Sequence, residues 1–201
     1  HYAFADVEIY LAYTNRFLRE SHWTELYQLF LKPANRWEFL PLRDFTYWLD
    51  FRLYGDDTGG FHATNLVWYL ASGMAVFYLF RNLVSLCRPA WAAQATVLSL
   101  CGTLVFVVHP AHVEVAAWIA SRKDLVAGTL GFLSLAVLTY AMSCRWPSRE
   151  MFLSIALLAM ACFGKASATT NILFVTLLLS FGWKNSLEVS RVKKLSYLFL
   201  F

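Results

Sequence analysis

Long apolar runs alternate with short polar segments over the last two thirds of the chain. A helix needs about 20 predominantly apolar residues to cross the hydrocarbon core of a bilayer. The first three runs are long enough to cross, and the next two are shorter, so we expect those two either to cross a thinned region or to continue through Lys165 with a bend at Gly164. The pattern predicts an all-α, polytopic membrane helix bundle over residues 62–201. In order, the expected spans are about 63–84, 91–108, 124–143, 151–164, 169–183 and 195 onward.

Residues 1–61 contain no run of that length, so we expect an extracytoplasmic loop with amphipathic interfacial helices. Apolar residues from Trp23 to Phe30 recur at three- and four-residue steps, which suits a helix lying on a membrane surface. Pro41 should open a second helix, and Gly55 is placed to cap it. The Gly-rich stretch 55–60 predicts a turn with solvated aspartates.

Composition supports a membrane protein. Apolar residues make up 59% of the 201 residues and charged residues only 15%, and the mean hydropathy is +0.49; a soluble domain has about 25% charged residues. The net charge of +4 comes without a basic block, so no nucleic-acid partner is indicated. The four cysteines have no metal-binding spacing, and we expect small buried hydrophobes, above all at Cys101 and Cys162.

The short basic loops determine the expected orientation. Arg88, Arg145, Arg149 and the cations of 184–194 fall on one side of the membrane if residues 1–62 lie on the other. The positive-inside rule makes the basic side cytoplasmic. The central polar stretch, His109 to Asp124, then lies outside.

The central stretch carries several chemically useful groups. Pro110 should open a helix on which Glu114, Trp118 and Arg122, four residues apart, share a face. Three readings stay open: a metal site of His109, His112 and Glu114; a structural set with Glu114 paired to Arg122 or Lys123; or a pocket for an anionic substrate near a helix N-terminus. His62 and Lys165 belong to the same outer layer.

Two further groups precede the spans. Asp6 and Glu8 lie two residues apart and could chelate a divalent cation, Mg²⁺ or Mn²⁺, or divide acid–base work, although a solvated loop is the simpler reading. Arg36 and Arg43 flank Pro41 and could clamp a phosphate or extend toward the membrane interface.

Several motifs together resemble the membrane half of TMTC-type proteins, the transmembrane and tetratricopeptide-repeat proteins that include protein O-mannosyltransferases and bacterial relatives. They are LPLRDFTYWLDFRLYG (40–55), GFHATNLVWYL (60–70), HPAHVEVAAWIASRKDLVAG (109–128) and FGKASA (163–168). The resemblance implies a GT-C glycosyltransferase fold, a polyprenyl- or dolichyl-phosphate sugar donor, and tetratricopeptide repeats after the membrane part. The chain starts without Met and stops inside an apolar run, so we expect a fragment of a longer protein.

The resemblance also implies site residues. Asp6 and Glu8 fall on the acidic motif, as base and helper, although Val7 separates carboxylates that are usually adjacent; the usual Lys-Glu near the fifth span reads Lys165-Ala166. The expected phosphate-binding residues are Arg43, Arg122, Lys123 and Lys165, and the expected lining residues are His62, His109, His112, Glu114 and Asp124. The expected partners are the lipid bilayer, the sugar donor, a protein or glycan acceptor and other membrane subunits. A scaffold that keeps the fold without the chemistry is the main alternative; a transporter, which would need charges deep inside its spans, is another.

Overall fold

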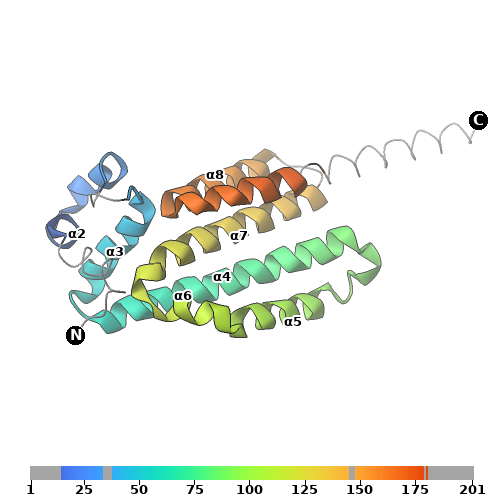
Figure 1. Cartoon of the computed structure of the whole chain (residues 1–201). Helices are drawn as coiled ribbons and strands as arrows, with labels where there is room; N and C mark the ends of the chain where they lie inside the picture. The colour runs from blue at the N-terminus through green and yellow to red at the C-terminus, as the bar shows by residue number, and fades with distance from the viewer. Residues whose placement is uncertain (1–14, 34–37, 145–147, 179, 181–201) are drawn as a thin grey trace, which may run out of the picture.

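A computed structural model describes residues 15–33, 38–144, 148–178 and 180. All regular structure in these ranges is helical (Figure 1), which confirms the all-α prediction. The long helices are α4 (Thr58–Cys87), α5 (Ala95–Val108), α7 (Arg122–Ser143) and α8 (Ser148–Gly164). They lie side by side in the order α5, α4, α7, α8, because α4 packs on α5 and α7, and α7 packs on α8.

Two helical stretches are long and apolar enough to cross a membrane, Thr58–Cys87 and Ile119–Ser143. A third span results if α5 and the following Pro110–Ala117 segment count as one, although they bend by 56°. These helices make the chain an integral membrane protein. An apolar helix, Ala166–Leu178, follows α8 and is too short to pass the same test.

The helices start where capping chemistry allows rather than where the apolar runs start. The carboxylate of Asp57 accepts a hydrogen bond from the backbone N–H of Gly59 at 2.9 Å, so α4 begins at Thr58. Asp56 pairs with Arg19 at 2.6 Å. The prediction of a turn with solvated aspartates is confirmed for the turn at Gly55 and Asp56 and for the exposure of both aspartates, but the stretch from Thr58 onward is helix; the two carboxylates also cap α4 and contact α2 (Arg16–Glu20).

The shorter helices before α4 gather at one end of the bundle. They are α2, the 3-10 helix η2 (Trp23–Phe30) and α3 (Pro41–Tyr54). Pro41 occupies the first turn of α3, and Gly55 ends it with φ +60°, a conformation that favours glycine. Both features confirm the sequence prediction. Their buried apolar core joins α3 to the start of α4, and it comprises Leu18, Leu29, Tyr47, Trp48, Phe51, Phe61 and Ile119.

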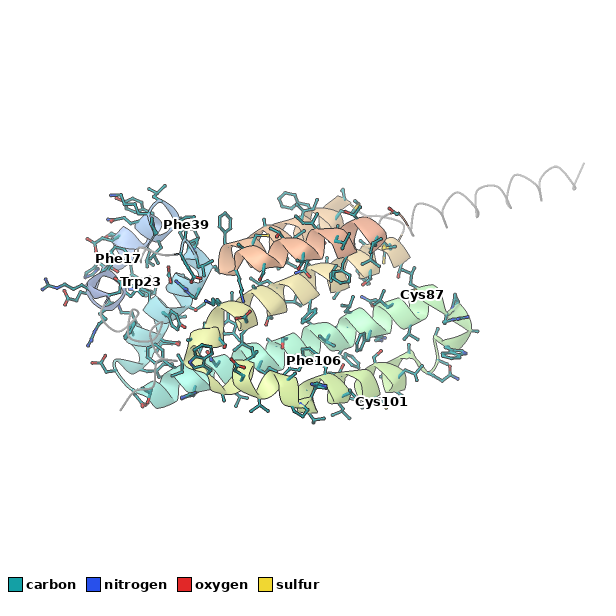
Figure 2. The ribbon with its side chains drawn as sticks, in the orientation of Figure 1. Phe17, Trp23, Phe39, Cys87, Cys101 and Phe106 are labelled. Atoms are coloured by element: carbon teal, nitrogen blue, oxygen red, sulfur yellow. The ribbon has the colours of Figure 1, made fainter. Side chains whose placement is uncertain are left out.

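Apolar side chains cover much of the outer surface. Figure 2 shows Trp23 on the α2–α3 end, where its ring is 62% exposed although its edge packs on Trp48 at 4.4 Å. Cys87 and Cys101 also lie on the surface, and all four cysteines are free. The prediction of buried cysteines was wrong for Cys87, Cys101 and Cys144, which are exposed, and Cys162 is half-buried. At Cys101 the reason is that α5 contacts the bundle along one side only and presents its other side outward.

Candidate functional site

The first turn of α7 carries three consecutive charges that point in three directions. Arg122 enters the protein interior, Lys123 faces the segment before α3, and Asp124 faces the end of α8. Successive helical residues are about 100° apart around the axis, which is why neighbours in sequence find different partners. The Ser-Arg-Lys-Asp motif therefore forms a junction of α3, α4, α7 and α8.

Arg122 is fully buried, with 0% of its side chain exposed. Its guanidinium pairs with Asp50 of α3 at 2.8 Å, donates to the backbone carbonyl of Phe61 at 2.9 Å and donates to the side-chain oxygen of Asn65. The same group lies over the ring of Tyr47 at 5.1 Å. Only the planar, multiply donating guanidinium can serve this set of partners at once.

Asp50 is equally buried, with 1% of its side chain exposed. Burial disfavours the charged form and raises the pKa of this carboxyl, although Arg122 and a hydrogen bond from Thr64 act in the opposite direction. The pair thus links α3 to α7 through an interior contact, and its two members are 72 residues apart.

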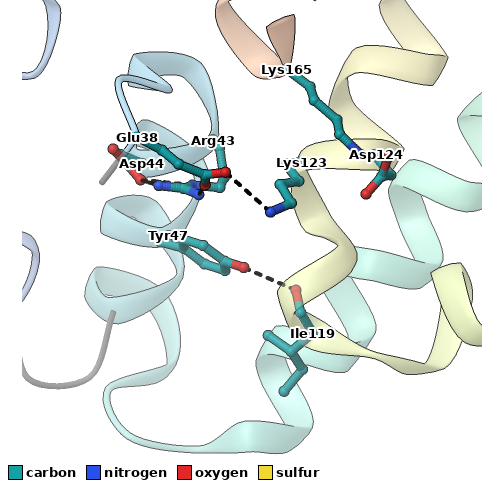
Figure 3. Close-up of polar contacts among 8 residues, drawn as sticks. All are labelled: Glu38, Arg43, Asp44, Tyr47, Ile119, Lys123, Asp124 and Lys165. Carbon is teal, nitrogen blue, oxygen red and sulfur yellow. Dashed lines mark hydrogen bonds and ion pairs between the residues drawn. The ribbon is translucent and has the colours of Figure 1, made fainter. Parts of the chain in front are cut away.

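A second charged group lies on the other side of the α7 start (Figure 3). Glu38 accepts from Arg43 at 2.7 Å and lies 3.5 Å from the ammonium of Lys123. Arg43 also pairs with Asp44 at 2.8 Å. Burial opposes the charge on Arg43, but Asp44 and Glu38 outweigh it, so the pKa of Arg43 is raised further and the group stays cationic.

The third contact joins α7 to the end of α8. The ammonium of Lys165 donates to a carboxylate oxygen of Asp124 (Figure 3). Lys165 directly follows the last residue of α8 and has an extended backbone. Both side chains are partly exposed, 33% for Lys165 and 37% for Asp124, unlike those of Arg43 and Arg122.

The histidine stretch takes a different form from the expected helix. The helix α6 covers only Val113–Ala117, and Trp118 is extended, so Glu114, Trp118 and Arg122 do not share one helical face. That prediction was wrong because the chain turns at Trp118 and buries Arg122. Within the described chain Glu114 is exposed and forms no ion pair, so the reading that paired it with Arg122 or Lys123, one of the three left open, was also wrong.

The histidines make local contacts. His109 accepts a hydrogen bond from the backbone N–H of Ala111 through Nδ1 at 3.1 Å, and the ring of His112 packs on Phe106 at 4.4 Å. His62 is exposed near the start of α4. Among the described residues, no three His, Cys, Asp or Glu side chains come together in a way that could hold a metal ion. The described part of the chain therefore gives no support to the metal reading of His109, His112 and Glu114.

Asp6, Glu8 and Arg36 lie outside the described residues. Of the expected site residues inside them, Arg43, Arg122, Lys123, Asp124 and Lys165 gather around the first turn of α7. They lie at the end of the bundle that carries α3 (Figure 1).

Sequence reasoning missed the carboxylates that pair with these cations, namely Glu38, Asp44 and Asp50. One signal was available for Asp50, which stands between Leu49 and Phe51 in an aromatic helix. A charge in such a helix is buried only if another group compensates it. The identity of that partner was not readable, because Asp50 and Arg122 are far apart in sequence.

The comparisons with known proteins agree with the motif resemblance. A protein O-mannosyl-transferase of Caenorhabditis elegans is similar to this chain, with 26% identity over 100 residues. The match covers 50% of this chain and 13% of that relative, so the chain spans a small part of its length. No family model matches the chain, and no solved structure matches it.

The helices and the charged junction thus define a polytopic membrane protein with a polar end. The relative that it resembles is a protein O-mannosyltransferase of the TMTC type, as the sequence motifs indicate.

Proposed function

We propose that this chain is part of a membrane glycosyltransferase that uses a polyprenyl- or dolichyl-phosphate sugar. It transfers the sugar to an extracytoplasmic acceptor, a protein hydroxyl or a glycan. The proposal includes a GT-C arrangement, with the polar end of the bundle facing away from the cytoplasm. The distant similarity to a protein O-mannosyltransferase supports this reading.

The observation that carries the proposal is the position of Lys123 and Lys165. Lys123 projects from the first turn of α7, and Lys165 contacts Asp124 of the same turn, where a membrane span ends. The N-terminus of a helix favours anions, and lysine ammonium groups bind phosphate. The two lysines are the part of the junction suited to hold the phosphate of a lipid-linked sugar.

Arg43 and Arg122 have a positioning role in this proposal. Both are buried and hydrogen-bonded to protein groups, Arg43 to Glu38 and Asp44, and Arg122 to Asp50 and Asn65. They hold the segments that present the two lysines. His109, His112, Glu114, Asp124 and His62 would line the approach on the same end.

The transfer step requires few protein groups. The acceptor oxygen bonds to the anomeric carbon as the bond from that carbon to the phosphate oxygen breaks, and the phosphate leaves with the electron pair. A carboxylate takes the acceptor's proton, and cations stabilise the negative charge that develops on the leaving group. We assign the base role to Asp6, with Glu8 as helper; a Mg²⁺ or Mn²⁺ ion at these two carboxylates remains a prediction.

One observation favours the alternative, a scaffold or accessory subunit without catalysis. The cations Arg43, Lys123 and Lys165 are matched by the carboxylates Glu38, Asp44 and Asp124, so the group balances its own charge. A balanced group is what a purely structural junction needs. A transporter receives no such support, because the charges of α4 and α7 lie toward the helix ends.

The test is sugar release from a polyprenyl-phosphate donor by the protein in lipid nanodiscs. The proposal predicts release by the wild type and a loss of at least about 100-fold in Asp6→Asn, the contribution expected of a general base. Glu20→Gln, an exposed carboxylate of α2, is the matched control and should keep full activity. Activity untouched in both Asp6→Asn and Glu8→Gln would overturn the assignment of the base.

A further inference from the structure

The pair formed by Lys165 and Asp124 differs from the buried Asp50–Arg122 pair of the junction. Lys165 comes from the segment after α8 and Asp124 from the first turn of α7, so the pair bridges two helices. It is a single ammonium–carboxylate contact that is about one third exposed. The Asp50–Arg122 pair is fully buried and supported by further hydrogen bonds.

Helix contact, rather than charge attraction, brings Lys165 to Asp124. Gly164 is buried at the end of α8, and a Cβ atom there would lie 3.2 Å from the backbone nitrogen of Ala127 and from a methyl group of Val126. The apolar cluster beneath contains Val126, Ala127, Leu130, Ala161 and Ala168. Because this contact fixes the two backbones, the ion pair can open without separating the helices.

A partly exposed ion pair contributes little to stability, about 1 kcal/mol or less. An incoming phosphate offers Lys165 more oxygen acceptors and up to two negative charges. Asp124 also retains a favourable position when it leaves Lys165, since it lies in the first turn of α7, where the helix dipole stabilises a carboxylate. For both reasons a phosphate can replace Asp124 as the partner of Lys165.

The surface of α8 supplies a path for an apolar chain. Phe152, Ile155 and Phe163 are exposed, at 75%, 63% and 47%, and their spacing places them on one stripe of α8. The stripe ends at Phe163, two residues before Lys165, and lies on the side of α8 opposite to the residues buried against α7. A hydrocarbon chain on this stripe would place its phosphate at the end of α8, beside the segment that carries Lys165.

We infer that Asp124 competes with the lipid-linked phosphate for the ammonium group of Lys165. A polyprenyl-linked phosphate displaces the carboxylate of Asp124 and pairs with Lys165 in its place. This inference rests on the proposed function for its ligand. In the absence of the ligand, Asp124 keeps Lys165 neutralised. On binding, the phosphate pairs with Lys165 and the carboxylate of Asp124 is released. The repulsion between the two anions limits the affinity.

Binding of farnesyl phosphate, a short polyprenyl phosphate, to the chain in nanodiscs tests the exchange. Removing the competitor in Asp124→Asn should strengthen binding about two- to fivefold, the range that corresponds to an exposed ion pair. Lys165→Gln should weaken it at least about tenfold, because the cation itself is lost. Lys32→Gln, an exposed lysine outside the junction, should bind as the wild type does. Unchanged or weaker binding by a folded Asp124→Asn would overturn the inference, because a purely structural pair gains nothing when it is broken.

Labelling of the wild type keeps the test valid even if a variant does not fold. Farnesyl phosphate should increase carbodiimide labelling of Asp124 and decrease reductive methylation of Lys165, both located by mass spectrometry. Protection of Lys165 without increased labelling of Asp124 would contradict displacement. Inorganic phosphate serves as the second probe. If it changes the labelling of both residues as much as farnesyl phosphate does, the claim that the ligand is a lipid-linked phosphate is overturned.

Sugar release measured in parallel separates the two proposals. Release by the wild type, with farnesyl phosphate binding weakened in Lys165→Gln but not strengthened in Asp124→Asn, would overturn the exchange and leave the transferase standing. Absence of release, with the expected binding changes intact, would overturn the transferase and leave the exchange standing.

Discussion

Arg122 at the start of α7 and Asp50 in α3 form an ion pair of 2.8 Å that is fully buried. Removing one member leaves the other charged and without compensation in the interior. Asp50→Ala should therefore lower the free energy of unfolding by about 3–5 kcal/mol. Denaturant unfolding in mixed micelles, followed by tryptophan fluorescence, measures this loss.

Glu20→Ala is the control for that substitution, because it breaks the exposed Arg16–Glu20 pair. It should change the free energy of unfolding by about 1 kcal/mol or less. Equal losses in the two variants would show that the buried pair does not hold α3 to α7.

The same pair gives a pH dependence of unusual sign. Burial raises the pKa of Asp50 in the folded protein. The folded protein then keeps this proton at pH values where the unfolded chain, with a pKa of about 3.9, has lost it. The contribution of Asp50 to the free energy of unfolding is therefore fully present below the pKa of the unfolded chain. It is lost as the pH rises through the raised pKa of the folded state.

The difference in unfolding free energy between the wild type and Asp50→Asn isolates this effect. From about pH 4 upward the wild type should lose unfolding free energy relative to Asp50→Asn. The difference should become constant once the pH exceeds the raised pKa of Asp50 in the folded protein. A shift in favour of the wild type with rising pH would mean that Arg122 outweighs burial and lowers the pKa of Asp50.

Two glycines of the bundle provide a matched test of the contact between α7 and α8. At Gly164 a Cβ atom would press on the backbone of Ala127, whereas at Gly128 it would meet nothing within 4 Å. Gly164→Ala should destabilise by about 1–3 kcal/mol through overpacking. Gly128→Ala, inside α7, should be neutral or stabilise by up to about 1 kcal/mol through helix propensity.

The unfolding free energies of the two variants show whether the contact between α7 and α8 at Gly164 is tight. Similar values for Gly164→Ala and Gly128→Ala would show that α8 can move away from α7 at no cost. The position of Lys165 would then not be set by the helix contact, and the exchangeable pair would lose its support.

The sequence predicted the positions of several helices but not the ion-pair partners of the charged side chains. Apolar runs predicted α4 and α7 because a bilayer-length run of apolar residues has few alternatives to a helix. Pro41 and Gly55 predicted both ends of α3 because each is restricted to few backbone conformations. Consecutive spans cross the membrane in opposite directions, so alternate polar segments lie on the same side. This predicted that Arg43, Lys123 and Lys165 lie at the same end of the bundle.

Partner choice was not predictable, because it depends on how the helices dock. Arg122 pairs with Asp50 rather than Glu114, since the chain turns at Trp118 and directs Arg122 inward. Glu38 contacts Lys123 across 85 residues of sequence. No local rule relates such pairs, and their geometry decides which cations are buried and which stay accessible to a ligand.

The central claim is that Lys123 and Lys165 hold the phosphate of a lipid-linked sugar. The most direct measurement is sugar release from a polyprenyl-phosphate donor by the Lys123→Gln/Lys165→Gln double variant in nanodiscs, beside Lys32→Gln as control. The account predicts a loss of at least about 100-fold in the double variant, as for removal of groups that stabilise a leaving charge, with a folded protein and an unaffected control. A wild type that releases sugar and a double variant that releases it equally fast would contradict the account.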